Sequence, residues 1–290
     1  MHKSGFVNII GKPNVGKSTL MNSLVGEKLS IITPKAQTTR HRIMGIVNGE
    51  DFQIVYSDTP GIIKPAYKLQ EGMMHFVEGA YEDADVLLLV IDIKDKNIDE
   101  AIIEKLITLE VPILVLLNKV DLSEQQELDD LFDQWKFRLP KAQIIPVSAL
   151  NKFNLTTVLN AILSHLPEAQ PFFPKDELTD KSQRFFISEI IREKILLYYK
   201  KEIPYSSEVI IDTFKEEAKI TKIRAEIIVE RETQRAIIIG HQGLAIKKLG
   251  TAARRDIENF LGKHVFLELF VKVNKDWRSK EGELKKFGYM

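Results

Sequence analysis

The chain contains a glycine-rich stretch at residues 11–18, which reads Gly11-Lys12-Pro13-Asn14-Val15-Gly16-Lys17-Ser18. It matches the pattern G-x-x-x-x-G-K-[ST] and lies between an apolar run, Phe6–Ile10, and a segment, Lys17–Gly26, for which we predict a strand and a helix. Glycine lets the backbone curl so that N–H groups point at phosphate oxygens, and the helix start adds a positive dipole end. Lys17 can reach the β- and γ-phosphates, while the Ser18 hydroxyl can ligate Mg²⁺. The stretch predicts a P-loop site for a nucleoside triphosphate.

A second motif, Asn118-Lys119-Val120-Asp121, indicates which base is bound. It follows the apolar run Val111–Leu117, which we predict as a strand, and α/β sheets bind ligands at the carboxyl ends of their strands. The Asp121 carboxylate can accept from the ring N–H and the exocyclic amine on one edge of guanine. Adenine lacks that pair of donors, and unmatched buried polar groups reject a ligand strongly. The motif therefore favours guanine, whereas a solvated loop is the alternative reading of the motif alone.

Two further motifs follow predicted strands. Asp58-Thr59-Pro60-Gly61 comes after Phe52–Tyr56, and Ser148-Ala149-Leu150 comes after Gln143–Val147. Asp58 can hold Mg²⁺ through water, and the Gly61 N–H can approach the γ-phosphate without interference from a Cβ. Taken singly, the first motif is also compatible with an ordinary Pro-Gly turn, and the second means little. The order and spacing of all four motifs carry the interpretation.

The four motifs together resemble those of translation-factor-related GTPases. That family has a mobile segment with a Mg²⁺-binding threonine between its first two motifs, and the matching stretch is Gln37-Thr38-Thr39-Arg40-His41-Arg42. The resemblance implies Mg²⁺ ligation by Ser18, Thr39 and Asp58, with Thr38 as the alternative threonine. It implies catalytic roles for Lys17, Thr39 and Gly61. The nucleotide contacts that it implies are Gly11, Lys12, Pro13, Asn14, Val15, Gly16, Lys17, Ser18, Thr19, Asp58, Thr59, Pro60, Gly61, Asn118, Lys119, Asp121, Ser148, Ala149 and Leu150.

One position departs from the Ras-like pattern, in which a glutamine after the third motif orients the attacking water. The chain has Ile62 there, and an aliphatic side chain cannot hydrogen-bond water. Backbone groups, the 37–42 segment, a cation or a partner would have to place the water. Asn14 stands where potassium-activated relatives use an asparagine to hold K⁺ near the phosphates. The alternative for Asn14 is a hydrogen bond that fixes the loop.

The first 167 residues predict an α/β G domain with a mostly parallel, doubly wound sheet, because short apolar runs alternate with amphipathic segments. A polar turn, Asn48–Asp51, joins two of the runs and predicts one antiparallel hairpin. The predicted strands are Phe6–Ile10, Ile43–Val47, Phe52–Tyr56, Val86–Asp92, Val111–Leu117 and Gln143–Val147. The predicted helices are Lys17–Gly26, the stretch around Met73–Ala80, Asp99–Leu109, Glu124–Leu139 and Leu155–Leu166.

A proline-rich stretch, 167–174, has three prolines in eight residues and predicts a linker, which we place at 168–180. Residues 181–290 predict a smaller α+β domain with a C-terminal tail. Its predicted elements are a helix at Lys181–Lys200, strands at Ser207–Phe214 and Ile223–Glu230, a short helix ending at Ile239, a helix to Leu261 and a strand at Val265–Val273. This αββααβ order is that of a type II KH domain.

The turn between the last two predicted helices reads Gly240-His241-Gln242-Gly243. In a KH domain such a G-x-x-G turn brings a helix start and bare backbone against about four nucleotides. Four basic residues follow on the next helix: Lys247, Lys248, Arg254 and Arg255. The sequence therefore predicts RNA contacts at these eight positions, although glycines that merely turn the chain are the alternative.

Charge and composition are consistent with this division. The net charge is zero, but residues 1–170 hold 17 Lys+Arg against 22 Asp+Glu, and residues 171–290 hold 24 against 19. A basic half can mark a nucleic-acid or membrane contact, or merely a solvated surface. The absence of cysteine excludes disulfides and cysteine-ligated metal centres. The start of the chain lacks a secretory pattern, and the densest apolar run, Val86–Ile91, is too short to span a bilayer.

With both domains considered, nearly the whole chain resembles the Era family of bacterial GTPases. Lys35–Ile43 is similar to the family's first switch segment, and Val271–Arg278 and Phe287–Tyr289 are similar to its tail. The resemblance implies a monomeric small-subunit assembly factor that hydrolyses GTP and binds 16S ribosomal RNA near its 3′ end, not DNA. It also implies a cytoplasmic location, with a peripheral contact at the inner membrane.

Two other classes of function stay open at this point. A metabolic phosphotransferase would use the P-loop for chemistry on a small molecule, but the guanine motif and the lack of an evident lid argue against it. A nucleotide-regulated interaction module would need no hydrolysis, and the intact Lys17, Ser18, Thr39 and Asp58 argue against that reading. GTP and ATP turnover, with and without RNA, separates the three.

Overall fold

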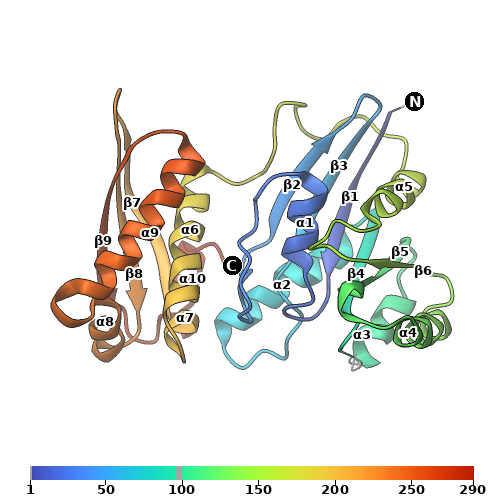
Figure 1. Cartoon of the computed structure of the whole chain (residues 1–290), viewed down its shortest axis with the longest axis horizontal. Helices are drawn as coiled ribbons and strands as arrows, with labels where there is room; N and C mark the ends of the chain where they lie inside the picture. Colours follow the sequence, from blue (N-terminus) through green and yellow to red (C-terminus); the bar gives the residue numbers. More distant parts are fainter. Residues whose placement is uncertain (1, 96–99) are drawn as a thin grey trace. The chain divides into compact units, whose positions relative to one another are not determined.

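The computed structural model describes residues 2–95 and 100–290, and these residues form two compact units. The first unit comprises Met1–Ser30, Thr39–Lys64 and Met73–Asp180. The second comprises Ile31–Thr38, Pro65–Gly72 and Lys181–Met290. Two short segments from the first part of the sequence therefore belong to the C-terminal unit. Figure 1 shows the elements of both units in sequence colours.

The N-terminal unit is built on a six-stranded sheet of order β2-β3-β1-β4-β5-β6. All neighbouring pairs are parallel except β2–β3, so the predicted hairpin and the predicted sheet type are confirmed. The strand bounds are β1 Lys3–Ile10, β2 Ile43–Asn48, β3 Phe52–Asp58, β4 Val86–Asp92, β5 Ile113–Asn118 and β6 Gln143–Val147. Strand β5 begins two residues later than predicted, after Pro112, which has no N–H to donate.

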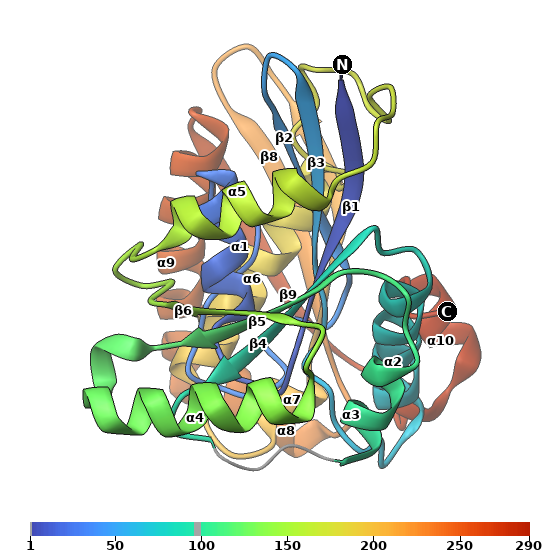
Figure 2. The ribbon, with the colours of Figure 1, turned by 90° about the vertical axis from the view of Figure 1, so that its right-hand side faces the viewer.

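Helices cover both faces of this sheet (Figure 2). One face packs under α2, α3 and α4, where Tyr81, Leu106 and Trp135 join the apolar side chains of β4 and β5 in one core. Helices α1 and α5 lie on the opposite face (Figure 2). The helix bounds are α1 Lys17–Val25, α2 Lys68–Glu82, α3 Glu100–Ile107, η1 Val120–Leu122, α4 Gln125–Arg138 and α5 Leu155–His165. The predicted start of the third helix, Asp99, lies outside the described residues.

The C-terminal unit has a three-stranded sheet of order β7-β8-β9, antiparallel between β7 and β8 and parallel between β8 and β9. The αββααβ order is confirmed, and the short helices α7, η2, η3 and α10 add to it. The bounds are α6 Gln183–Tyr198, α7 Ile203–Ser206, β7 Glu208–Glu216, β8 Thr221–Val229, α8 Glu232–Ile239, η2 His241–Gly243, α9 Leu244–Leu261, β9 Val265–Val273, η3 Trp277–Ser279 and α10 Glu281–Lys286. Ser182 caps α6, because its side chain accepts from the Phe185 N–H.

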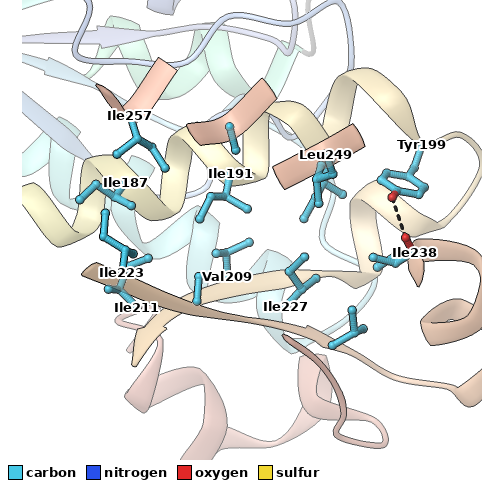
Figure 3. Packing of buried hydrophobic residues seen from close by; sticks show 14 of the residues in the cluster. Ile187, Ile191, Tyr199, Val209, Ile211, Ile223, Ile227, Ile238, Leu249 and Ile257 are labelled. Carbon is cyan, nitrogen blue, oxygen red and sulfur yellow. Dashed lines mark hydrogen bonds between the residues drawn. The ribbon is translucent and has the colours of Figure 1, made fainter. Parts of the chain in front are cut away.

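The core of this unit lies between the sheet and the helices α6, α8 and α9 (Figure 3). Ile191 of α6, Ile227 of β8 and Leu249 of α9 are fully buried in it. The Tyr199 hydroxyl donates to the Ile238 carbonyl at 2.8 Å and so ties the end of α6 to α8. The helices that hold the candidate RNA-binding residues thus rest on one continuous apolar layer.

The predicted linker, 168–180, is hydrogen-bonded to the N-terminal unit. The Gln53 side chain donates to the Phe173 carbonyl and accepts from the Phe172 and Phe173 N–H groups. Further along, the Ile46 N–H donates to the Leu178 carbonyl at 2.8 Å. The segment therefore runs beside β2 and β3. No helix in the described parts of the chain is both long and apolar enough to cross a membrane.

Candidate functional site

The P-loop joins β1 to α1 and encloses the amine of Lys17. Lys17 is buried, and its Nζ donates to the carbonyls of Gly11 at 3.0 Å and Lys12 at 2.8 Å. Burial lowers the pKa of Lys17 to about 8, an effect that the nearby Asp58 carboxylate partly opposes. The amine is therefore held inside the loop that the sequence predicts for phosphates.

Asn118 at the end of β5 links the P-loop to the loop after β6. Its Nδ2 donates to the Val15 carbonyl at 2.7 Å, and its Oδ1 accepts from the Ala149 N–H at 2.9 Å. Gly16 is required beside it, because a Cβ there would lie 2.3 Å from Asn118 Nδ2. Three of the predicted motifs are thus joined by one amide side chain.

The predicted guanine motif is assembled by two ordered contacts. Ser148 Oγ donates to Asp121 Oδ1 at 2.5 Å and so fixes the orientation of that carboxylate. Lys119 Nζ donates to the Asn14 carbonyl at 2.8 Å and to Asp92 Oδ2 at 2.6 Å. Asp92 was not among the sequence-predicted site residues, although its position at the end of β4 was a usable signal.

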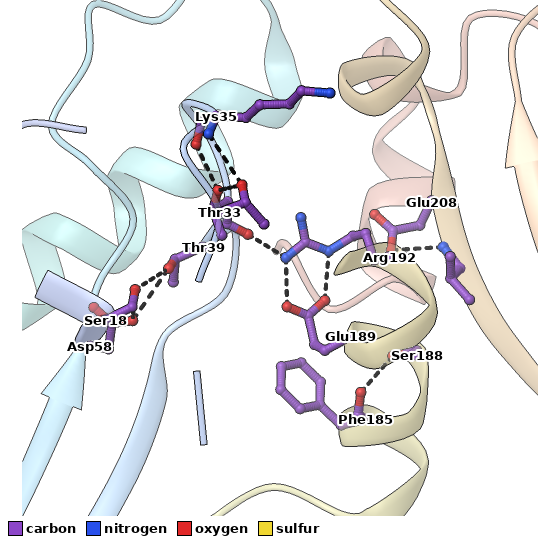
Figure 4. Close-up of polar contacts among 12 residues, drawn as sticks. Ser18, Thr33, Lys35, Thr39, Asp58, Phe185, Ser188, Glu189, Arg192 and Glu208 are labelled. Atoms are coloured by element: carbon purple, nitrogen blue, oxygen red, sulfur yellow. Dashed lines mark hydrogen bonds and ion pairs between the residues drawn. The ribbon is translucent and has the colours of Figure 1, made fainter. Parts of the chain in front are cut away.

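Three of the predicted metal ligands converge on one point (Figure 4). Ser18 Oγ donates to Asp58 Oδ2 at 2.6 Å and lies 2.9 Å from Thr39 Oγ1, which donates to the same carboxylate oxygen at 3.2 Å. Asp58 is fully buried, and burial raises its pKa. Its Oδ1 has no hydrogen-bond partner within residues 2–95 and 100–290. Two hydroxyls and a buried carboxylate with an unsatisfied oxygen fit a hard divalent cation such as Mg²⁺.

Thr38, the alternative threonine, lies in a different environment. Its Oγ1 donates to the Lys35 carbonyl at 2.6 Å and contacts Thr33 Oγ1 at 2.7 Å. It belongs to the C-terminal unit, whereas Thr39 begins the next stretch of the N-terminal unit. The geometry therefore places Thr39, and not Thr38, beside Ser18 and Asp58.

The 58–61 motif packs directly on the P-loop. A Cβ at Gly61 would lie 2.7 Å from the backbone nitrogen of Pro13, so glycine is required for this approach. The Thr59 hydroxyl donates to the Ile9 carbonyl at 2.7 Å, and the Ile62 N–H donates to the Gly11 carbonyl at 3.0 Å. The Ile62 side chain packs against the core beneath α2–α4, consistent with its inability to orient water.

The other predicted nucleotide contacts occupy the rim of the same site. Asn14 is exposed and adopts a left-handed conformation with φ 64°. Lys12 Nζ forms an ion pair with Asp95 at 3.0 Å. Pro60 is buried, Thr19 is half-buried in the first turn of α1, and Leu150 is 76% exposed.

The second candidate site surrounds the turn between α8 and α9. Gly240 and Gly243 have φ of 72° and 76°, and Gln242 has φ 50°, so three of the four turn residues have positive φ. A Cβ at Gly240 would meet the Ala245 Cβ at 2.5 Å, whereas Gly243 has open space and is required for its conformation alone. His241 and Gln242 are exposed.

Basic side chains continue from this turn along α9. The four predicted residues, Lys247, Lys248, Arg254 and Arg255, are all exposed. Lys247 and Arg254 line two hollows on either side of α9, one toward β9 and one toward α6. Tyr198 lines the second hollow, with Lys248 Nζ 5.3 Å from its ring centre. Sequence reasoning missed Tyr198, because a tyrosine at the end of an apolar helix carries no distinct signal.

The fold and these two sites define a class of protein: a Mg²⁺-dependent GTPase whose G domain is followed by a type II KH domain. The profile of a family described as "50S ribosome-binding GTPase" matches residues 6–119, and that of the "KH domain" matches residues 202–278. The chain is 46% identical, over its full length and 96% of the relative, to GTPase Era of Syntrophus aciditrophicus (strain SB). The chain belongs to the Era family of GTPases.

Two solved structures agree with this assignment along the whole chain. Era in complex with MgGDPNP and nucleotides 1506–1542 of 16S ribosomal RNA has a TM-score of 0.95 and 41% identity, covering 100% of this chain and 99% of that one. A tyrosine-to-alanine variant of Aquifex aeolicus Era, bound to GDP·AlF4⁻, has the same TM-score and identity and 99% coverage of both chains. The fold of this chain thus matches that of solved Era GTPases over both domains.

Proposed function

We propose that this GTPase binds 16S ribosomal RNA near its 3′ end through the KH turn, and that the bound nucleotide sets its affinity for that RNA. The observation that carries the proposal is the exposed Gly240–Gly243 turn, which leads into the basic face of α9. A KH turn of this kind clamps about four nucleotides by backbone N–H groups and a helix start. The full-length similarity to an Era that was crystallised with such an RNA supports this choice of partner.

At the nucleotide site we assign three roles to the chain's own residues. Lys17 is positioned to neutralise the β- and γ-phosphates, and the Gly61 N–H to bind the γ-phosphate. Asp121 is positioned to accept from guanine, with its orientation set by the Ser148 hydroxyl. These roles rest on the contacts of the P-loop, β3 and β5 loops with one another.

For the metal we assign Ser18 and Thr39 as hydroxyl ligands, with Asp58 as the carboxylate of the site. Bound Mg²⁺ supplies positive charge that stabilises the phosphate oxygens during transfer. The carboxylate already accepts from both hydroxyls, so these side chains are oriented toward a common centre. Ile62 packs against the core, so water would be positioned by backbone groups, by the 37–42 segment, by a cation or by a partner.

We further propose that the protein acts as a small-subunit assembly factor in the cytoplasm, as a monomer that does not bind DNA. We retain three regions along the sequence: the G domain at 1–167, the linker at 168–180 and the KH domain with its tail at 181–290. A peripheral contact with the inner membrane stays a prediction. Fractionation of cell lysate, followed by detection of the protein in ribosomal and membrane fractions, tests the location.

Replacing both His241 and Gln242 by Asp tests the RNA proposal. The change places two carboxylates beside the expected phosphates, and like charges in close contact cost several kcal/mol in recognition interfaces. We expect RNA affinity to fall about tenfold or more. Gln242 is left-handed, a conformation that Asp tolerates, and both glycines are unchanged, so the fold should persist. Binding of a 3′-terminal 16S fragment is titrated at fixed salt, because phosphate contacts make affinity salt-dependent.

Lys219→Glu is the matched control, since it changes the net charge by the same amount at an exposed turn between β7 and β8. It should leave RNA binding close to that of the parent. GTP affinity and basal hydrolysis should be unchanged in both variants. A double Asp variant that binds RNA as well as the parent would show that this turn is not the RNA site.

A further inference from the structure

One boundary between the two units falls between Thr38 and Thr39, immediately before a proposed metal ligand. Residues Ile31–Thr38 belong to the C-terminal unit, and Thr39 begins the next stretch of the N-terminal unit. The peptide that joins Thr38 to Thr39 is planar and stiff, so the Thr38 carbonyl and the Thr39 backbone nitrogen cannot move independently. Whatever holds the Thr38 carbonyl therefore also limits where the Thr39 hydroxyl can go.

A buried arginine of α6 holds that carbonyl (Figure 4). Arg192 is 1% exposed, and its Nη2 donates to the Thr38 carbonyl. The same guanidinium binds Glu189, one turn earlier in α6, through Nε at 2.7 Å and through Nη2 at 2.5 Å. Burying an arginine is costly unless its charge is paired and its donors are satisfied. Glu189 supplies the opposite charge and accepts from Nε and Nη2, whereas Nη1 has no hydrogen-bond partner within residues 2–95 and 100–290. The guanidinium is thus fixed by Glu189 and presents Nη2 to Thr38.

A second cation attaches the same segment to the end of α6. Lys35 Nζ donates to the carbonyls of Leu196 and Tyr199, at the C-terminus of the helix. Carbonyls at a helix C-terminus lack intrahelical partners and carry the negative end of the dipole, so a lysine is well placed there. The Lys35 carbonyl in turn accepts from the Thr38 hydroxyl at 2.6 Å. Segment 31–38 is therefore held along α6 at two points.

We propose that Arg192 is a positioning residue for GTP hydrolysis, which holds the Thr38 carbonyl so that Thr39 is presented to Mg²⁺. The inference rests on the proposed role of Thr39 as a metal ligand. Under this proposal, binding of Mg²⁺ and the γ-phosphate at Thr39 is coupled to α6 of the KH domain through Arg192. By linkage, any ligand that shifts α6 changes the affinity for Mg²⁺–GTP by the same factor as Mg²⁺–GTP changes the affinity for that ligand. The contact of Lys248 on α9 with Tyr198 on α6 provides a route for RNA to do so.

The test replaces the whole ion pair, Arg192→Met with Glu189→Met, because removing one partner would leave a buried charge unpaired. A hydrogen bond from a charged group is strong enough that we expect hydrolysis at saturating GTP to fall about tenfold, and the Mg²⁺ concentration for half-maximal rate to rise about tenfold. Affinity for GDP, measured with Mg²⁺ chelated, should stay within about twofold of the parent. Lys35→Met should act in the same direction, because it removes the second attachment and leaves the ion pair intact.

Arg184→Met is the matched control. It removes an arginine from the first turn of the same helix, whose guanidinium donates to the Ile211 carbonyl and not to segment 31–38. Its rate and Mg²⁺ dependence should equal those of the parent. A double Met variant with unchanged Mg²⁺ dependence overturns the inference. A variant that loses GDP affinity in parallel with rate also overturns it, because such a loss indicates a purely structural role.

Thr39→Ala separates this inference from the assignment beneath it. One outcome is that Thr39→Ala raises the Mg²⁺ concentration for half-maximal rate while the Arg192–Glu189 replacement and Lys35→Met leave it unchanged. In that case only the positioning role is wrong. If Thr39→Ala leaves the Mg²⁺ dependence unchanged, the metal-ligand assignment fails, and the positioning role fails with it.

Discussion

The carboxylate of Asp121 is oriented by one hydroxyl, and this contact makes a sharp test of base recognition. Ser148 Oγ donates to Asp121 Oδ1, so in Asp121→Asn the same hydroxyl should bind the amide oxygen and direct the NH₂ group toward the base. Xanthine has a carbonyl where guanine has its exocyclic amine. We expect the variant to bind xanthosine triphosphate more tightly than GTP, by about tenfold or more, in a competition titration.

Asp121→Ala serves as the comparison, because it removes the acceptors without supplying a donor. It should lose affinity for GTP and gain none for xanthosine triphosphate. Equal GTP affinity in the parent and the Asn variant would mean that Asp121 does not contact the base.

The buried amine of Lys17 predicts a proton-linked affinity for nucleotide. Its pKa is lowered to about 8, mainly by burial, so above that pH the amine of the free protein is neutral. A bound phosphate favours the charged form, and nucleotide binding at about pH 9 should therefore take up close to one proton. Affinity for GDP should fall as the pH rises through about 8. Calorimetry in buffers with different ionisation enthalpies measures the uptake.

Lys17→Arg is the control for that titration, because a guanidinium stays protonated throughout this range. Its GDP binding should show no proton uptake from this position.

The effect of Lys17 on folding stability has the opposite sign. The unfolded lysine binds a proton up to about pH 10, so between about pH 8 and 10 this group makes the folded protein more stable as the pH rises. A parent protein with no buffer dependence at about pH 9 contradicts the lowered pKa.

The choice between Thr38 and Thr39 shows what single residues reveal in sequence and what they do not. The four motifs were recognisable because each follows a predicted strand at a spacing that the chemistry requires. Two adjacent threonines differ in neither chemistry nor pattern, and only the contacts of Ser18 and Asp58 distinguish them. Arg192 was also invisible in sequence, because an arginine in an amphipathic helix is ordinarily a solvated one.

At the scale of one element, the P-loop predicts that the rate of GTP hydrolysis depends on the monovalent cation present. Asn14 is exposed at the tip of the loop, and the aliphatic side chain of Ile62 cannot position water. A fixed positive charge near the phosphates would stabilise the transition state. We expect GTP hydrolysis to be faster in potassium than in sodium, and Asn14→Gly to abolish the difference. Glycine is the appropriate replacement because position 14 has φ 64°, where alanine would add backbone strain.

Asn14→Asp keeps a side-chain oxygen at the same place and tolerates the same backbone conformation. It should therefore retain a preference for potassium. Identical rates of the parent protein in the two salts would contradict the cation proposal, whatever the variants do.

Elements with strong periodicity were predictable, and those stabilised by distant partners were not. Every strand in the described part of the chain was expected, with errors at the ends. Helix α2 begins at Lys68, five residues before the expected Met73, because its first turn packs against the C-terminal tail. Gly72 weakens the helical signal there, yet a Cβ at that position would lie 2.7 Å from the Tyr289 carbonyl. Helix α10 was expected only as tail, since its burial of Leu284 depends on tertiary packing.

At the scale of the whole molecule, the stability of two short segments is expected to follow that of the unit to which they belong. Ile31–Thr38 and Pro65–Gly72 belong to the C-terminal unit, where Tyr67 packs 4.8 Å from the Arg278 guanidinium and Lys68 pairs with Glu281 at 2.5 Å. Ile191→Ala should remove about 2–5 kcal/mol from that unit by leaving a cavity in its core. We expect amide hydrogen exchange to become faster in both segments, together with β7 and β8, while β1 and α1 change little.

Leu116→Ala, in the fully buried part of β5, is the reciprocal variant. It should speed exchange in the first unit and leave segments 31–38 and 65–72 nearly unchanged. Exchange in these segments that follows Leu116→Ala and not Ile191→Ala would assign them to the N-terminal unit instead.

This division of the chain could not be read from sequence order. The proline-rich stretch predicted a linker at 168–180, and the second unit resumes at Lys181. Charge and composition, however, are sums over continuous stretches and cannot reveal that two short pieces of the first half pack elsewhere. Their membership depends on tertiary contacts, among them those of Lys35, Tyr67 and Lys68.

The interleaving of the two units restricts how such a protein can be recombined. A chimera that fuses residues 1–180 of this chain to the KH domain of a distant relative would inherit Lys35, Thr38 and Lys68 without Arg192 or Glu281. Both halves of such a hybrid could fold, and the hybrid would still couple GTP binding poorly to the C-terminal half. Exchange between relatives is expected to succeed only when both short segments travel with the C-terminal half, so genetic shuffling at a single crossover is disfavoured.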